Sequence, residues 1–159
     1  MVVTICAGAV ALLALCGQTL AQELTAAERV RYERVVRQTP LIDGHNDLPW
    51  EIRENYGGNV AAVDLNADTR QLATPLHTDI PRLRAGGLGA QFWSLYVPAS
   101  EKGADSTAAV FEQMYLANNM IARYPQAFEL ADSSADILRI HRAGRVASMF
   151  GIEGGEAIN

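Results

Sequence analysis

Apolar residues gather in short runs along this chain, and segments with helical spacing separate most of the runs. Segments 41–47 (LIDGHND) and 90–97 (AQFWSLYV) have a composition typical of short strands. Segment 146–152 (VASMFGI) is apolar throughout, which is typical of a strand buried on both faces. A short strand is also expected near residues 128–130. The pattern therefore predicts three main strands and one short strand.

Helices are predicted between these strands. Thr25 and Glu28 have the spacing of a capping box, and the mixed charges that follow indicate a surface helix packed on the domain. Ser133 is placed to cap a later helix, with Gly144 just after its end. The expected helices span residues 25–38, 79–85, 105–124 and 133–143. The polar stretch 53–77 is expected to be a long irregular surface excursion with at most one helical turn.

The alternation of strands and helices indicates an α/β fold with a parallel sheet. Two architectures fit that order: a small open sheet, or the N-terminal part of a closed TIM (β/α)₈ barrel. A complete barrel needs roughly 250 residues, whereas this chain has 159. Because the chain stops at Asn159, just past a strand, we expect residues 22–159 to be the N-terminal part of a truncated barrel domain.

The first 21 residues differ from the rest because they contain no charged side chain. Their apolar centre, residues 10–15 (VALLAL), is shorter than the ~20 residues of a membrane span. Thr19 and Ala21 are the small residues expected just before a cleavage point at Gln22. We therefore expect residues 1–21 to be a signal peptide and the protein to be secreted or extracytoplasmic, in the periplasm or at the cell surface. The alternative is an uncleaved leader that anchors the chain.

Charge and cysteine content exclude two kinds of partner or site. The chain has 13 Lys and Arg against 18 Asp and Glu, a net charge of −5, with no basic cluster. Nucleic-acid binding through phosphate neutralisation is therefore not expected. Both cysteines, Cys6 and Cys16, lie in the leader. The mature chain can then form no disulfide and no thiolate metal site, so His, Asp and Glu must hold any metal ion.

The first candidate metal ligands are His45 and Asp47, at the end of a predicted strand. Residues two apart in an extended chain project to the same side, so both side chains could reach one metal ion. Asp43 lies one step deeper on that side, where it could orient a ligand. An imidazole and a carboxylate suit zinc or another divalent transition ion. The alternative is a plain turn in which Asn46 and Asp47 hydrogen-bond to the backbone.

The second candidate group is residues 153–156 (EGGE), directly after a predicted buried strand. A carboxylate at the C-terminal end of a parallel strand lies where α/β folds bind ligands. The alternative is a glycine loop with solvated glutamates. Trp50 could line a substrate pocket, although an aromatic residue beside a proline also packs without a function. Segment 91–94 (QFWS) is expected to pack in the core, and His77 and His141 are expected to be structural or exposed.

Three strings in this chain resemble the N-terminal third of membrane dipeptidases, peptidase family M19. They are residues 41–50 (LIDGHNDLPW), 78–94 (TDIPRLRAGGLGAQFWS) and 146–155 (VASMFGIEGG). Their order and spacing match as well, and the resemblance runs from about residue 41 to residue 159. Three long strings in order are far more specific than the spacing of His45 and Asp47 alone.

The resemblance implies a (β/α)₈ barrel of the metal-dependent hydrolase type. It would use two Zn²⁺ ions and a metal-bridging hydroxide to hydrolyse dipeptides. Carried over by position, His45 and Asp47 would bind the first zinc, and Glu153 would bridge both ions. Dipeptides are the implied substrates, and a homodimer is a possible assembly. Membrane association is expected only through an uncleaved leader or through a C-terminal anchor outside this sequence.

One position departs from the family pattern, because many relatives have histidine where this chain has Glu156. We therefore assign no metal role to Glu156. The resemblance also implies that the histidines of the second zinc lie beyond Asn159, so we expect this chain alone to be inactive. Two alternatives stay open: a non-catalytic secreted binding protein on the same scaffold, and a binuclear amidohydrolase that acts on a non-peptide amide.

Overall fold

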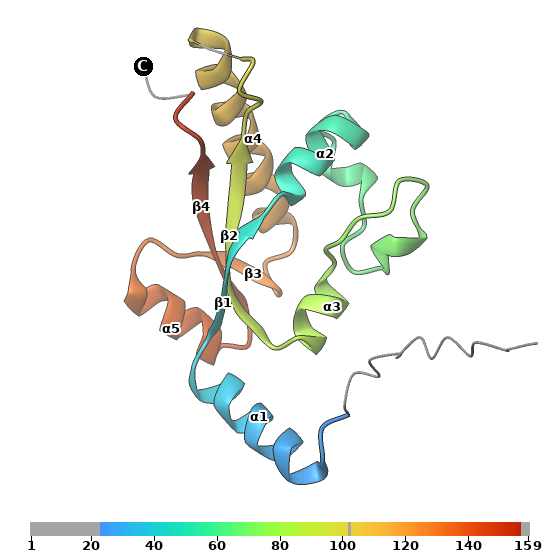
Figure 1. Cartoon of the computed structure of the whole chain (residues 1–159), viewed down its shortest axis with the longest axis vertical. Coiled ribbons are helices and arrows are strands. Elements are labelled where there is room, and N and C mark those ends of the chain that lie inside the picture. The colour runs from blue at the N-terminus through green and yellow to red at the C-terminus, as the bar shows by residue number, and fades with distance from the viewer. Residues whose placement is uncertain (1–22, 102, 157–159) are drawn as a thin grey trace, which may run out of the picture.

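The computed structural model of the chain describes residues 23–101 and 103–156. The expected signal peptide at residues 1–21 lies outside the described residues. In the described part, four parallel strands form one sheet with helices around it (Figure 1). This arrangement confirms the α/β fold with a parallel sheet that the sequence predicted.

The sheet is centred on its second and fourth strands. The strands are β1 (Leu41–Asn46), β2 (Leu88–Tyr96), β3 (Phe128–Leu130) and β4 (Val146–Glu153). Their order in the sheet is β1-β2-β4-β3. β4 pairs with most of β2, so that Tyr96 at the end of β2 lies beside Glu153 at the end of β4. The C-terminal ends of β1, β2 and β4 therefore lie along one edge of the sheet, where α/β folds place their sites.

The described residues form five α-helices beside the sheet, and several begin or end where the sequence predicts. They are α1 (Ala26–Gln38), α2 (Leu48–Tyr56), α3 (Ile80–Ala85), α4 (Ala104–Arg123) and α5 (Ser134–Arg142). Thr25 and Glu28 form the predicted capping box of α1, and Ser133 caps α5. Gly144 follows α5 with a φ of 74°, in the left-handed region that favours glycine. No helix in the described ranges is long and apolar enough to cross a membrane.

The prediction of a surface excursion over residues 53–77 is wrong in two respects. First, α2 extends to Tyr56, so the start of the segment is helical; Pro49 lies in the first turn of this helix, where a missing N–H costs nothing. Second, two 3₁₀ turns follow, η1 (Val60–Ala62) and η2 (Thr69–Gln71), and the apolar side chains around them are buried. Those side chains are Val60, Val63, Leu65 and Leu76. The segment is irregular, but it belongs to the main core.

Helices pack against both faces of the sheet. On one face, Trp93 and Leu95 of β2 are completely buried in clusters that include α4 side chains. On the other face, Ala90 near the start of β2 packs with Ile140 of α5. Towards the strand ends this second face opens, and Phe92 is 36% exposed. The open part of this face adjoins the strand ends that carry the candidate ligands.

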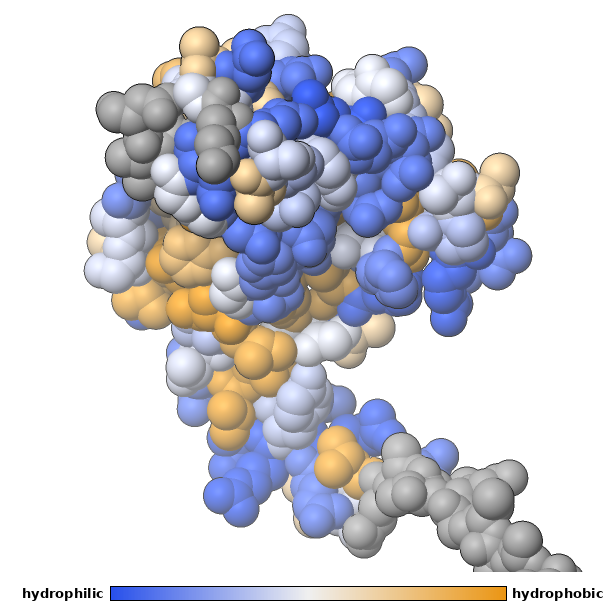
Figure 2. Space-filling model, turned by 45° about the horizontal axis from the view of Figure 1, so that its top comes forward, coloured by the Kyte–Doolittle hydropathy of each residue, from blue (hydrophilic) through white to orange (hydrophobic). Residues whose placement is uncertain are grey.

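Two predictions about burial need correction. β4 is fully buried only over residues 146–148, because its later residues are partly or fully exposed, and Ile152 is 50% exposed. Helix α1 is a surface helix as expected, but none of its residues is buried, and the Tyr32 hydroxyl donates to the Gly86 carbonyl. Figure 1 shows α1 projecting from the N-terminal end of the sheet. Figure 2 shows apolar surface gathered on one side of the molecule. The described residues thus leave some apolar strand surface uncovered.

Candidate metal centre

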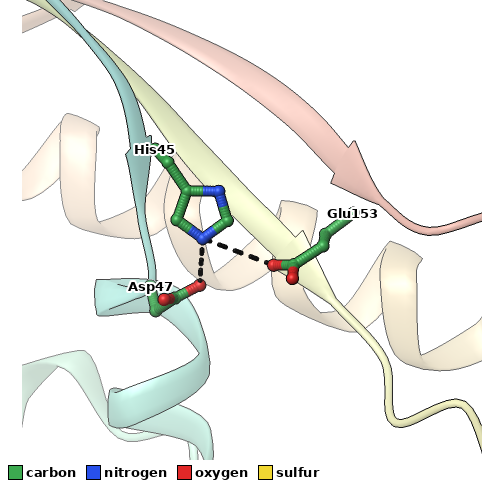
Figure 3. A group of neighbouring side chains, drawn as sticks. All are labelled: His45, Asp47 and Glu153. Atoms are coloured by element: carbon green, nitrogen blue, oxygen red, sulfur yellow. Dashed lines mark hydrogen bonds and ion pairs between the residues drawn. The ribbon is translucent and has the colours of Figure 1, made fainter.

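Three predicted ligands meet at the C-terminal edge of the sheet. His45 lies near the end of β1, Asp47 follows that strand as the first residue before α2, and Glu153 is the last residue of β4. Figure 3 shows the His45 imidazole with one ring nitrogen facing both carboxylates. Because β1 and β4 are parallel strands of one sheet, residues far apart in the sequence are brought to one place.

The distances in this cluster suit a bound zinc ion. His45 Nε2 lies 3.0 Å from Asp47 Oδ1 and 3.4 Å from Glu153 Oε2, and one ligand atom from each residue lies within 4.8 Å of the others. Two atoms that bind one tetrahedral zinc ion at ~2.0–2.2 Å lie roughly 3.3–3.6 Å apart. Only small side-chain shifts would therefore be needed for all three to bind one ion.

The charge of the cluster also favours a cation. Asp47 and Glu153 place two carboxylates beside one imidazole, and their side chains are 47% and 42% exposed. Among the ion pairs of the described residues, no Arg or Lys reaches either carboxylate. Like charges at close range repel each other unless a cation lies between them. An imidazole with two carboxylates is a ligand set that zinc accepts.

Asn46 stabilises the turn between the candidate ligands His45 and Asp47. Its side-chain oxygen accepts a hydrogen bond from the Leu48 N–H at 3.1 Å. Its side-chain nitrogen lies 3.0 Å from Thr78 Oγ1 and 3.4 Å from Gln91 Oε1. Asn46 thus makes the backbone hydrogen bond that the alternative interpretation expected, whereas the Asp47 side chain caps no backbone N–H of α2, and the same turn presents His45 and Asp47. Gln91 and Thr78 are buried and fix this turn to the fold.

Asp43 lies beside an irregularity in strand pairing, so simple strand alternation does not describe its position relative to His45. The pairing of β1 with β2 shifts between Asp43 and Asn46, so one extra residue lies in β1 there. Asp43 Oδ1 accepts a hydrogen bond from the backbone N–H of His45 at 3.2 Å. Asp43 thus contacts the backbone that carries His45, and it lies outside the group of three converging ligand atoms.

Ser94 is a site residue that sequence reasoning missed. Segment 91–94 was expected to pack in the core, and Trp93 does so with no exposed surface. Ser94 instead donates a hydrogen bond to Glu153 Oε2 at 2.9 Å. Glu156 is fixed through its backbone, because its carbonyl accepts from the Ser106 hydroxyl at 2.7 Å. The sequence signal for Ser94 was weak, because it is one of two polar residues, with Gln91, in a largely apolar strand.

A cavity of about 240 Å³ adjoins the cluster. Its lining residues are His45, Asn46, Asp47, Leu48, Glu51, Leu76, His77 and Thr78. His77 is exposed, as expected, but it lies at this cavity. Trp50 is not among the lining residues; its ring packs edge-on against Tyr96 at 4.9 Å, with the Arg53 guanidinium 5.4 Å away. His141 lies at the other end of the sheet, near Gly89.

Comparison with known proteins identifies close sequence relatives. The sequence model described as membrane dipeptidase (peptidase family M19) matches residues 29–159. Dipeptidase ataJ of Aspergillus terreus is 42% identical over 134 residues, which cover 79% of this chain and 31% of the relative. Dipeptidase verJ of Clonostachys rogersoniana is 34% identical over 131 residues, 76% of this chain and 32% of the relative. The chain thus spans about a third of the length of the curated relatives it matches.

Two solved structures share the fold of this chain. A crystal structure of a dipeptidase AC, described as a metallopeptidase of family M19, has a TM-score of 0.61 at 23% identity, covering 77% of this chain and 37% of its own. A metallopeptidase from Rhodobacter sphaeroides, liganded with a phosphinate mimic of the dipeptide L-Ala-D-Ala, has a TM-score of 0.60 at 21% identity. That match covers 77% of this chain and 40% of the other. The described sheet corresponds to part of the TIM barrel of such dipeptidases.

Proposed function

We propose a zinc-dependent dipeptidase activity for the protein that contains this chain, which belongs to the membrane dipeptidase family, peptidase family M19. The observation that carries the proposal is the convergence of His45, Asp47 and Glu153 at one edge of the sheet. These residues come from two strands and the turn after the first of them, yet their ligand atoms lie at distances that suit a common ion. Family membership supports a metallopeptidase, and the cluster is where we propose that the metal binds.

In this proposal His45 and Asp47 would hold one ion, and the Glu153 carboxylate would be shared between that ion and a second one. Glu153 Oε2 faces His45 and accepts from Ser94, whereas no hydrogen bond within the described residues reaches its Oε1. Bound zinc would supply a water of lowered pKa and would polarise the carbonyl of the scissile bond. Asn46 and Asp43 hold the backbone around His45, so the imidazole keeps its position.

A dipeptide is the proposed substrate class. Two curated relatives are named dipeptidases, and the Rhodobacter sphaeroides structure holds a phosphinate mimic of L-Ala-D-Ala. The cavity of about 240 Å³ beside His45 lies just below the roughly 300–1,000 Å³ of most ligand pockets. Its lining includes His77 and Glu51, which could contact a polar substrate. Trp50 remains a proposed pocket residue on the Tyr96 side of the strand ends.

Two further parts of the proposal concern the chain as a whole. The described residues bring one imidazole and two carboxylates to the cluster, fewer ligands than two zinc ions need. We therefore propose that residues 22–159 alone do not hydrolyse dipeptides. From the uncharged apolar pattern of residues 1–21, we also propose export through a signal peptide. N-terminal sequencing of the exported protein would test this, because the proposal predicts Gln22 as its first residue.

Hydrolysis of L-Ala-L-Ala by the full-length protein that contains this chain tests the proposed activity. We expect turnover that chelation removes and added zinc restores, and a loss of at least about 100-fold in Glu153→Gln. The matched control is Glu54→Gln, which changes a glutamate of similar exposure, 46% against 42%, away from the cluster. Zinc-independent turnover, or full activity in Glu153→Gln, would contradict the proposal. Zinc binding without dipeptide turnover would favour a non-peptide amide substrate or a binding protein.

A further inference from the structure

A buried hydroxyl contacts the carboxylate that is proposed to bridge the metals. Ser94 lies two residues before the end of β2 (Leu88–Tyr96), on the strand between β1 and β4. The residue is 3% exposed, and its Oγ lies 2.9 Å from Glu153 Oε2. Its hydrogen bond is charge-assisted, because the acceptor is a carboxylate, and such bonds are stronger than those between neutral groups.

The position of this hydrogen bond matters because it falls on the oxygen that faces the histidine. Glu153 Oε2 accepts from Ser94 and lies 3.4 Å from His45 Nε2. The terminal torsion of a glutamate is broad, so an exposed carboxylate rotates easily unless something holds it. The Glu153 side chain is 42% exposed, and within the described residues the Ser94 hydroxyl is the hydrogen-bond donor that reaches it. Ser94 therefore restricts where this oxygen points.

We propose that Ser94 is a positioning residue that orients Glu153 for metal binding. The inference rests on the proposed function, because it assumes that Glu153 binds the metal. Hydrogen bonds to ligating carboxylates typically change metal affinity by about 10- to 100-fold when they are removed. Ser94 would act through Glu153 and would not touch the ion.

A second buried serine on the neighbouring strand provides a matched control. Ser148 of β4 is completely buried, and its hydroxyl has no hydrogen-bond partner within the described residues. Ser148 pairs with Gln91, whereas Ser94 pairs with Gly151. A Cβ added at Gly151 would meet no atom nearer than 4.0 Å, so a threonine at position 94 would face an uncrowded neighbour and would keep the hydroxyl. The chain thus offers a deletion, a conservative replacement and a control.

The test measures the zinc affinity of the full-length protein by competition with a chromophoric chelator. We expect Ser94→Ala to bind Zn²⁺ about 10- to 100-fold more weakly, Ser94→Thr to stay within about threefold of the unmodified protein, and Ser148→Ala to be unchanged. In a Glu153→Ala background, Ser94→Ala should cause no further loss. A purely structural role for Ser94 would instead lower affinity in both backgrounds, and threonine would not restore it. Circular dichroism of each variant checks the fold, and Ser94→Cys, of similar size, replaces Ser94→Ala if that variant does not fold.

The outcomes separate this inference from the proposed function. If the unmodified protein binds no zinc, or if Glu153→Ala binds it equally well, the proposed metal centre fails. If zinc binding depends on Glu153 but Ser94→Ala or Ser94→Cys binds zinc as tightly as the unmodified protein, only the role of Ser94 is overturned. If zinc binding depends on both Glu153 and Ser94 as expected, and threonine at position 94 restores the affinity, the inference stands.

Discussion

Replacement of Asp79 by alanine should destabilise the fold next to the candidate site. Asp79 caps helix α3, and its carboxylate is 1% exposed. It accepts hydrogen bonds from the Arg82 N–H at 2.8 Å, from Arg82 Nε at 2.7 Å and from the Thr69 N–H at 3.1 Å. This cluster ties the irregular segment before α3 to the helix. The adjacent Thr78 contacts Asn46 in the turn that presents the candidate ligands.

The size of the effect follows from the groups that lose their partner. Loss of the helix cap costs about 1 kcal/mol. The buried Thr69 N–H and the Arg82 guanidinium would be left without this acceptor, at about 1–3 kcal/mol more. Removing one partner of a fully buried ion pair costs about 3–5 kcal/mol. Because the Arg82 side chain is 32% exposed and can turn to water, we expect Asp79→Ala to lower the free energy of unfolding by about 2–4 kcal/mol.

The same cluster sets a direction for the pH dependence. Burial alone would raise the pKa of Asp79, but hydrogen bonds from Arg82 and Thr69 outweigh it and hold the pKa below the ordinary value of 3.8. A carboxyl group with a lowered folded-state pKa stabilises the fold above its unfolded-state pKa. That contribution is lost as the pH falls through the folded-state value. The difference between the unmodified protein and Asp79→Ala should therefore be full near pH 6 and shrink below about pH 4.

Urea unfolding of the full-length protein, followed by tryptophan fluorescence, measures this difference. The control is Asp68→Ala, because Asp68 also caps a short helix and pairs with an arginine, Arg70, but at the surface. We expect a smaller loss in that variant, from its own cap alone, since the exposed ion pair contributes little. The reasoning is refuted if Asp79→Ala and Asp68→Ala unfold at the same urea concentration, or if the effect of Asp79→Ala grows as the pH falls below 4.

Three further outcomes are expected. Asn46→Ala removes the oxygen that accepts from the Leu48 N–H and the hydrogen bond to Thr78. The zinc affinity of the full-length protein should therefore fall about tenfold in chelator competition, and unchanged affinity would contradict this role. Gly89→Ala would place a Cβ 2.7 Å from Pro40 Cβ and should lower the free energy of unfolding in urea by about 1–3 kcal/mol. The control Gly151→Ala should change stability little, because its new Cβ meets no atom nearer than 4.0 Å. Equal effects of the two variants would argue against steric crowding. Dialysis against EDTA should abolish dipeptide hydrolysis and zinc should restore it, so full activity after dialysis would argue against a metal centre.

Local signals predicted most of the regular structure. The capping box at Thr25, the serine at Ser133 and the glycine at Gly144 mark helix ends because they act on neighbouring backbone groups. Alternating apolar runs and helices predicted the parallel sheet for a similar reason, since each βα unit is a local pattern. The short strand at residues 128–130 is confirmed at those positions.

Features set by tertiary packing were predicted less well. No helix was predicted at residues 48–56, yet Pro49 lies in the first turn of α2, because proline is as suitable in a first helical turn as after a strand. Val63 and Leu65 belong to an apolar pattern too short to predict a strand or a helix, and their burial depends on the core that they join. β4 is fully buried only at its start, because burial along a strand depends on what the rest of the fold places over it.

The same distinction between local signals and tertiary packing applies to the candidate site. The spacing of His45 and Asp47 predicted that they could act together, the end of a buried strand made Glu153 a candidate, and the family resemblance implied that Glu153 joins them at the metal. The register shift beside Asp43 could not be predicted, since it arises from pairing between strands. Ser94 also escaped prediction, because its partner Glu153 lies far along the sequence and the contact exists only when β2 and β4 are paired.

The central claim is that an imidazole and two carboxylates from β1 and β4 hold zinc together. The most direct measurement is the zinc content of the purified full-length protein by mass spectrometry, after dialysis that removes loosely bound metal. We expect stoichiometric zinc in the unmodified protein and in Glu54→Gln, and its loss when His45 and Glu153 are both replaced by alanine. Absence of zinc from the unmodified protein, or equal zinc in that double variant, would contradict it.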